Sequence, residues 1–331
     1  LNVVFQEKSG AQGALITALE KLGLGYDLDE SVRAVLFEDP AIHYPVIGQD
    51  ESLAALTNAE VLRHYAAYYR PDNMTLIVVG NVQPDALKTA VLAQLGGLEA
   101  NSGSLPRRSP LTPANAGPYE IAVRGPTLSD QVRVMKGFLT VGRSHPDYWR
   151  IEVLTELLAN RLTDVLRYQQ GLVYWLGAYQ VAFSDGGYFA IATSTARADA
   201  AAAVTQIDSA LQLLASNGVE PEELEHAKRA LIGRLALSLD DNLDRAHWLA
   251  QWASVLSADQ LVPDFRRDLE AVTADQVVEA LQHYSVPKHR YVAQHIPFVT
   301  VAGFPTQAFA VVLGLALVLI AGWLRRRQRQ Q

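Results

Sequence analysis

One pattern occurs twice in this chain, at residues 53–76 and again at residues 269–292, with a constant offset of 216 residues and no gap. Repeats that stack into solenoids recur every 20 to 50 residues or so, and an offset of this size indicates instead two similar domains in tandem. Since the second copy ends near residue 300, the first domain is expected to begin upstream of Leu1. The identical pairs are Leu53/Leu269, Ala55/Ala271, Thr57/Thr273, Val61/Val277, Tyr68/Tyr284 and Pro71/Pro287.

Each copy carries the start and stop signals of a helix, a Thr before an amphipathic run and a Pro after it. An apolar run follows each Pro, and we expect strands at residues 74–80 and 290–293. Residues 101–118 are rich in Ser, Pro, Gly and Asn, which is typical of a linker. The predicted organisation is therefore the closing part of a first domain at residues 1–100, this linker, and a second domain at residues 119–303.

Strands and long helices are predicted without a regular βαβ alternation. We expect strands at residues 120–123, 131–139, 172–183 and 187–193, and helices at 9–24, 84–95, 148–170, 198–216, 221–239 and 242–256. This mixture predicts an α+β fold class, with tandem homologous domains whose mostly antiparallel sheets are packed by helices.

The C-terminus predicts a transmembrane helix. Residues 304–324 carry no charge, and as a helix they would be about 31 Å long, the thickness of a bilayer core. Trp323 stands where an interfacial aromatic residue belongs, and a basic tail at residues 325–331 follows at once. A buried core helix is the alternative. By the positive-inside rule we expect a single-pass membrane protein with a cytoplasmic C-terminus and with globular domains in the periplasm or outside the cell.

Composition excludes several kinds of site. The net charge is −7 and the basic residues are scattered before the tail, which argues against a nucleic-acid partner. The chain has no cysteine, so disulfides, a thiolate nucleophile and a Cys-ligated zinc are excluded. No His-x-x-x-His occurs, and the run Glu222–His226 lacks the first His of a zinc helix, so we interpret it as a solvated helix face.

The segment from Leu166 to Tyr174 has a more distinctive arrangement. Arg167 lies in the last turn of a predicted helix, Gly171 breaks that helix, and Tyr174 stands near the start of the next strand. Both side chains are thus expected at one end of the unit, where a guanidinium and a phenol can hydrogen-bond a peptide carbonyl or a developing oxyanion. The alternative on residue chemistry alone is structural: a cation that favours the helix dipole and a Tyr that packs on a strand.

Several segments together resemble the pitrilysin/insulinase family of zinc metallopeptidases. They are the runs at residues 43–48, 53–57, 68–76 and 78–82, together with the segment from Leu166 to Tyr174. The likeness extends from residue 2 to about residue 295. It implies two homologous α+β domains that face each other around a substrate chamber.

The resemblance also implies a zinc site. In the family, a His-x-x-Glu-His helix supplies two ligands and a general base, and a Glu from a later helix supplies the third ligand. The segment from Asn2 to Glu7 looks like the one that carries this third ligand, which assigns it to Glu7, while the histidines and the general base are expected upstream of Leu1. The family's substrate-binding Arg and Tyr correspond here to Arg167 and Tyr174. Gln169 and Gln170 replace the charged pair often found before the Gly, which puts substrate preference in doubt.

The sequence therefore predicts a membrane-anchored zinc endopeptidase that hydrolyses peptides or unfolded polypeptides, with the chain as given inactive alone. One alternative is a noncatalytic subunit that supplies Arg167 and Tyr174 to a homologous, zinc-bearing partner. Another is a structural subunit like the core proteins of respiratory complexes, for which zinc is irrelevant.

Overall fold

The computed structural model describes residues 28–43, 46, 48–98, 110–114, 116–256, 260 and 262–299. Glu7, the predicted helix at residues 9–24, most of the predicted linker, and residues 304–331 with the expected transmembrane helix and basic tail lie outside the described residues.

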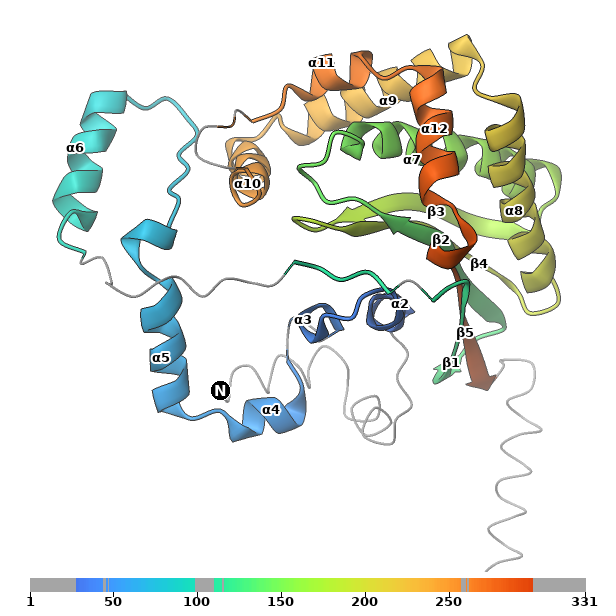
Figure 1. Cartoon of the computed structure of the whole chain (residues 1–331), viewed down its shortest axis with the longest axis horizontal. Coiled ribbons are helices and arrows are strands. Elements are labelled where there is room, and N and C mark those ends of the chain that lie inside the picture. Colours follow the sequence, from blue (N-terminus) through green and yellow to red (C-terminus); the bar gives the residue numbers. More distant parts are fainter. Residues whose placement is uncertain are drawn as a thin grey trace, which may run out of the picture.

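A five-stranded sheet organises the second half of the chain (Figure 1). The strand order is β1-β5-β2-β4-β3, so β1 and β3 are the edges. β1 and β5 pair in parallel and every other neighbouring pair is antiparallel, which makes the sheet mixed. The strands are β1 Tyr119–Leu128, β2 Gln131–Thr140, β3 Val173–Ala182, β4 Gly187–Ala196 and β5 Arg290–Val299.

One face of this sheet is covered by helices that lie together in the upper part of Figure 1. The main core forms between that face and the central helix α7, and Phe138, Leu154 and Leu158 within it are at most 1% exposed. Apolar side chains on the inner face of α7 and on alternate strand positions thus drive this layer together. The helices are α7 Tyr148–Leu162, α8 Ala200–Asn217, α9 Pro221–Ser238, α10 Asn242–Ala253, α11 Phe265–Glu270 and α12 Ala274–Tyr284.

The opposite face of the sheet is covered by a helix from far earlier in the chain. Helix α2 (Leu28–Leu36) contributes Leu28, Val32 and Leu36 to a second buried cluster with side chains of β2, β4 and β5. The hydroxyl of Tyr188 on β4 donates a 2.9 Å hydrogen bond to the carboxylate of Asp29. The sheet is therefore a middle layer, with helices on both sides (Figure 1).

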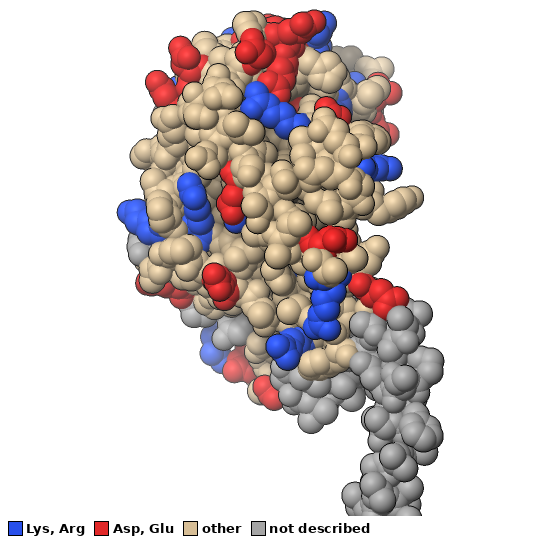
Figure 2. All heavy atoms as spheres, turned by 90° about the vertical axis from the view of Figure 1, so that its right-hand side faces the viewer, with Lys and Arg blue, Asp and Glu red and all other residues tan. Residues whose placement is uncertain are grey.

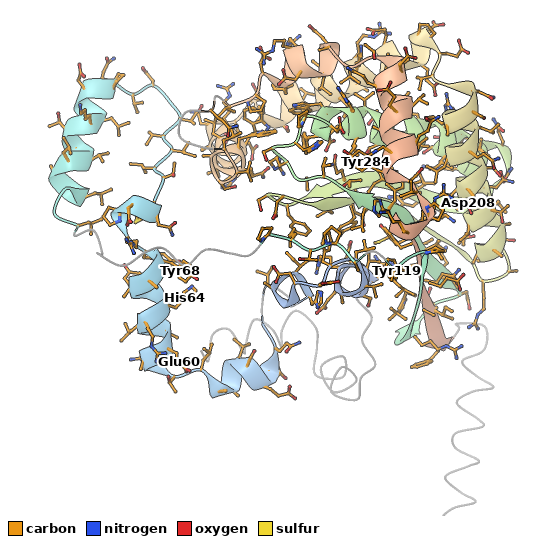
Figure 3. All side chains as sticks on the ribbon, in the orientation of Figure 1. Glu60, His64, Tyr68, Tyr119, Asp208 and Tyr284 are labelled. Atoms are coloured by element: carbon orange, nitrogen blue, oxygen red, sulfur yellow. The ribbon has the colours of Figure 1, made fainter. Side chains whose placement is uncertain are left out.

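The remaining described helices lie apart from the sheet, except the short helix at residues 40–43, whose Ile42 packs against the second buried cluster (Figures 1 and 3). They are α3 Pro40–His43, α4 Asp50–Ala55, α5 Asn58–Tyr68 and α6 Pro84–Leu95, with a short 3-10 turn, η1 Pro71–Asn73. In Figure 3, Glu60, His64 and Tyr68 lie along α5, away from the sheet, whereas Tyr284 belongs to the helical layer on the sheet. No residue of α5 or α6 is buried.

The strand expected at residues 74–80 is wrong, because these residues have no regular structure. The corresponding strand β5 pairs with β1 on one side and with β2 on the other. Residues 74–80 have no such neighbours in the described part of the chain, and an apolar run becomes a strand only where it can pair.

Two further expectations are corrected. The described residues contain one sheet and so one α+β domain, not two tandem domains that each hold a sheet. In addition, the described residues do not supply the expected membrane-spanning helix: none of their helices is long and apolar enough to cross a membrane, and residues 304–324 lie outside them.

Charges of both signs are interspersed on the face shown in Figure 2. One pair that crosses between layers is Lys136 on β2 with Asp208 on α8, whose charged atoms are 2.7 Å apart. Arg161 on α7 likewise pairs with Glu223 on α9 at 2.6 Å. The first pair joins α8 to the sheet, and the second joins α9 to α7.

Candidate functional site

The candidate site begins where α7 changes its helical geometry. The predicted helix at residues 148–170 is present, but only Tyr148–Leu162 is α-helical, and Thr163–Gln169 (η2) forms a π-helix. The amide of Gln170 donates to the carbonyl of Val165 at 3.0 Å, five residues back, which is the π-helical spacing. Such wide turns are rare and frequently occur at functional sites, and this one carries Arg167.

Gly171 then reverses the chain. Its φ of +64° lies in the left-handed region, which a side chain disfavours and glycine adopts without strain. The following amide, of Leu172, donates to the carbonyl of Leu166 at 2.8 Å, and Leu166 itself is fully buried. This closure fixes the direction in which the chain enters β3.

Tyr174 occupies an irregular position on β3. Val173 pairs with Thr195 and Trp175 with Ser194, so two residues on β3 advance against one on β4 and Tyr174 falls within the bulge. Bulges re-aim side chains and are common beside active sites. Two threonines of β4 hold the bulge: the hydroxyl of Thr195 donates to the carbonyl of Leu172 at 2.7 Å, and that of Thr193 donates to the carbonyl of Trp175.

These three irregularities bring Arg167 and Tyr174 together. The guanidinium carbon of Arg167 lies 5.5 Å from the ring centroid of Tyr174, and also 5.5 Å from that of Tyr168. A cation over two aromatic faces is held in place while the N–H groups at its edge stay available. We call this cluster of Arg167, Tyr168 and Tyr174 the Arg167 site.

The Arg167 site is open to solvent. Tyr168 is 69% exposed and Tyr174 79% exposed, and Trp175 beside them is 52% exposed. Exposed aromatic side chains that cluster in this way often mark an interaction site. The group can present guanidinium and phenol donors to a carbonyl oxygen, next to the unpaired edge of β3.

The sequence did not single out three of these residues. The sequence pattern does not predict a role for Tyr168, because its ring lies beside Arg167 only through the π-helical turn. Thr193 and Thr195 act through hydroxyls on backbone carbonyls, and their only signal in the sequence is alternation along a strand, which is also what packing produces.

The described residues do not fit a zinc ion. They contain no group of three or more His, Asp or Glu side chains placed to hold a metal, and Glu7 lies outside them. In the run Glu222–His226, Glu223 pairs with Arg161 and Glu225 with Lys228. That run is a charged helix face rather than half of a metal site.

Comparison with known proteins establishes the family. The family model described as the Peptidase M16 inactive domain matches residues 55–231, which is more than half of the chain. This chain belongs to the M16 peptidase family. The match covers the whole Arg167 site, together with α5, β1 to β4, α7 and α8.

Relatives and solved structures agree with this assignment. An uncharacterized zinc protease of Mycobacterium leprae is 28% identical over 292 residues, which cover 85% of this chain and 63% of that protein. The chain therefore spans less than two thirds of that relative's length. A structure described as the peptidase M16 inactive domain from Pseudomonas fluorescens has a TM-score of 0.74 and 19% identity, and the match covers 90% of this chain and 71% of that one.

The same fold also occurs in a chain of a complex III structure. A chain in the structure of complex III from Candida albicans has a TM-score of 0.69 and 17% identity, with coverage of 85% of this chain and 70% of that one. At this level of identity the likeness concerns the fold alone.

Proposed function

We propose that this chain is the substrate-contacting part of an M16 zinc endopeptidase that acts on peptides or unfolded polypeptides. In this proposal Arg167 and Tyr174 hydrogen-bond a backbone carbonyl of the substrate. Zinc is held outside the described residues, with Glu7 as one ligand and with two His ligands and the general base upstream of Leu1.

The main support for the proposal is that three backbone irregularities lie around one exposed cation, Arg167. Each of them departs from regular backbone hydrogen bonding: the π-helical turn, the left-handed Gly171 and the bulge at Tyr174. A cation that served only the helix dipole would need none of them. Their common result is that Arg167 and Tyr174 face solvent beside an open strand edge.

The experiment uses the protein expressed from its complete reading frame. We expect it to cleave an unstructured fluorogenic peptide, to lose activity on chelation and to regain it with zinc. Glu7→Gln should abolish zinc retention. Arg167→Gln and Tyr174→Phe should retain zinc but lower kcat/KM, each by roughly ten- to a hundredfold, as expected for the loss of a hydrogen bond to a charged or developing charged group.

Matched controls distinguish the loss of a substrate contact from a general disturbance of the fold. Arg229→Gln removes an exposed arginine on α9, and Tyr168→Phe removes a hydroxyl within the Arg167 site while keeping the ring under the guanidinium. Both should stay within about threefold of the parent kcat/KM, since neither removes a proposed substrate contact. An unchanged kcat/KM in both Arg167→Gln and Tyr174→Phe would refute the assigned role.

A second candidate is a noncatalytic subunit that supplies Arg167 and Tyr174 to a homologous, zinc-bearing partner. It is favoured by the apolar side chains exposed on residues 61–78, which include Leu62 at 59%, Tyr65 at 58% and Leu76 at 58%. Such surfaces commonly meet another protein surface. If the protein from its complete reading frame lacks activity and zinc but gains activity on mixing with a homologous subunit, this candidate replaces the first.

A structural subunit, as in the complex III assembly, is the third candidate. It predicts that Arg167→Gln changes neither peptide hydrolysis nor peptide binding. Assembly with partner subunits would then be the only measurable role of the chain.

A further inference from the structure

A pocket of about 350 Å³ lies at the beginning of α7. Its walls come from the loop before α7, from the end of α10, and from the junction of α11 with α12. The helical run from Tyr148 to Gln169 separates it from the Arg167 site by roughly 30 Å, at 1.5 Å per residue. We call this cavity the Trp252 pocket, and its size suits a small ligand or one residue of a larger one.

One wall of the Trp252 pocket is aromatic. Trp149 and Trp252 stack with ring centroids 5.8 Å apart and an interplanar angle of 27°. Tyr148 packs edge-on against both indoles and steadies them. Leu256 and Val272 extend the apolar wall. The pocket can therefore receive a flat or branched apolar group.

The indole N–H of Trp252 has no hydrogen-bond partner in the described structure, although Trp252 is only 2% exposed. A buried donor without an acceptor costs about 1 to 3 kcal/mol, so such groups are rare and call for an explanation. Trp252 lines the pocket, but its indole nitrogen is closed to solvent, so an acceptor on a bound group would reach this N–H only after a small shift of the pocket wall.

The charge of the pocket comes mainly from Arg143. Its guanidinium carbon lies 5.5 Å from the ring centroids of both Tyr148 and Trp252, and no carboxylate of the described residues is within 4.0 Å. The largely buried carboxyl of Glu152, whose pKa burial raises to about 6, interacts with Arg143 only at longer range.

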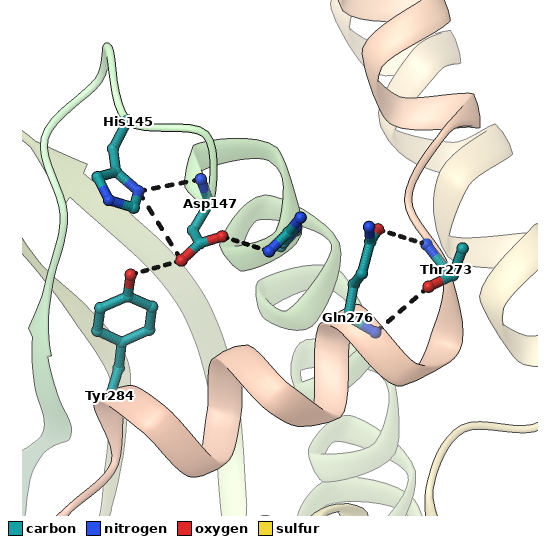
Figure 4. Close-up of polar contacts among 6 residues, drawn as sticks. His145, Asp147, Thr273, Gln276 and Tyr284 are labelled. Carbon is teal, nitrogen blue, oxygen red and sulfur yellow. Dashed lines mark hydrogen bonds and ion pairs between the residues drawn. The ribbon is translucent and has the colours of Figure 1, made fainter.

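The other charged residues of the pocket already have partners. Arg150 pairs with Asp147 at 2.6 Å, and Asp147 also accepts a 2.6 Å hydrogen bond from the hydroxyl of Tyr284 (Figure 4). His145 lies 3.8 Å from the same carboxylate (Figure 4). Asp268 pairs with Arg267 at 2.9 Å. Arg143 is thus the cation best placed to meet an incoming anion.

We propose that the Trp252 pocket binds a carboxylate carried on an aromatic or branched apolar group, with the carboxylate at Arg143 and the apolar group against the two indoles. A peptide that ends in such a residue and a free aromatic acid share this chemistry. A cationic ligand would be repelled by Arg143, and a purely apolar one would leave this guanidinium without an anion. This site does not depend on the peptidase function.

Isothermal titration calorimetry of the chain tests this proposal. The probes are N-acetylphenylalanine, its amide, and a hexapeptide that ends in Phe with either a free or an amidated C-terminus. We expect the free acids to bind at least tenfold more tightly than the amides, since the amides lack the charge that meets Arg143. A hexapeptide acid that binds more tightly than N-acetylphenylalanine identifies a peptide terminus as the ligand, and equal or weaker binding identifies a small acid.

Three variants locate the binding. Arg143→Gln should weaken acid binding by tenfold or more, while Arg197→Gln, a surface control, should leave it unchanged. Ala271 lines the pocket and is exposed, so a larger side chain at this position fills the pocket without removing an existing contact. Ala271→Phe should therefore abolish binding. Trp252→Phe replaces the buried indole with a smaller phenyl ring and deletes the unpaired N–H, so it should weaken binding and also lower the thermal stability through the cavity that it leaves. Equal affinity for acids and amides, no binding of any probe, or full binding by Ala271→Phe would overturn the proposal.

Discussion

Helices α5 and α12 begin and end alike but have opposite surroundings. Each has 11 residues, each starts at a Thr that forms a capping box, and each is followed by a 3-10 turn that begins with Pro. Yet α12 buries Val277, Ala280, Leu281 and Tyr284 against α7 and the sheet, whereas α5 buries nothing. The repeated pattern therefore determines the helix and its caps, while burial depends on a neighbouring layer.

The largest expected difference between the two helices concerns their apolar side chains. Leu281 in α12 is fully buried, and Leu62 in α5 is 59% exposed. Leu281→Ala should lower the free energy of unfolding by about 2 to 5 kcal/mol, because it removes buried methyl groups and leaves a cavity. Leu62→Ala should change it by less than about 0.5 kcal/mol. Urea denaturation of the two variants measures both values, and equal losses would show that α5 is packed after all.

The paired tyrosines should differ next. The hydroxyl of Tyr284 donates to the carboxylate of Asp147, and burial together with this hydrogen bond raises the pKa of Tyr284. Tyr284→Phe should cost about 1.5 to 3 kcal/mol, the usual worth of a hydrogen bond to a charged group. Tyr68 is 37% exposed, and Tyr68→Phe should cost about 0.5 kcal/mol or less. Thermal unfolding compares them, and a harmless Tyr284→Phe would contradict the assigned bond.

A smaller effect is expected at the two caps. Thr57→Ala and Thr273→Ala each delete a side chain that accepts from the backbone N–H three residues on. Thr273→Ala should lower global stability by about 1 kcal/mol, because α12 unfolds with the core. Thr57→Ala should mainly speed amide hydrogen exchange in the first turn of α5. If Thr57→Ala instead lowered the global unfolding midpoint as much as Thr273→Ala, the two helices would not differ as described.

The smallest expected difference is in pH response. The backbone N–H and the hydroxyl of Thr57 donate to Glu60, which lowers the pKa of this carboxyl, whereas Gln276 holds the same place at Thr273 and does not titrate. Because the folded pKa is depressed, the cap of α5 is complete above the unfolded value and weakens as pH falls through the folded value. In an NMR titration the Thr57 amide should shift with a midpoint below 4.5, and the Thr273 amide should not shift. A Thr57 midpoint at or above 4.5 would argue against the capping box.

What the sequence predicted well was local. The helices at residues 84–95, 198–216 and 221–239 and the strands at 131–139 and 187–193 agree with α6, α8, α9, β2 and β4 within a few residues, because caps, prolines and alternation mark them. The sequence failed where a neighbour decides the outcome. Residues 74–80 have the composition of a strand but no strand to pair with, and α2 was not expected to cover the sheet of a unit that begins 90 residues later.

The candidate site was predicted in part for the same reason. Arg167, Gly171 and Tyr174 are recognisable from a helix end, a helix breaker and a strand start. The bulge that brings Tyr174 to Arg167 arises from the pairing of β3 with β4, which no local pattern encodes, and the sequence pattern did not predict the π-helical turn. Glu7 lies outside the described residues, so its role as a zinc ligand stays a prediction.

A double-mutant cycle on kcat/KM for peptide hydrolysis, with Arg167→Gln, Tyr174→Phe and the double variant of the protein from its complete reading frame, tests the central claim most directly. If both side chains contact the same substrate carbonyl, the double variant should lose clearly less than the product of the two single losses, since each group depends on the other. Parent-like kcat/KM in all three variants, or losses that multiply fully, would contradict the Arg167 site as a single substrate-contacting unit.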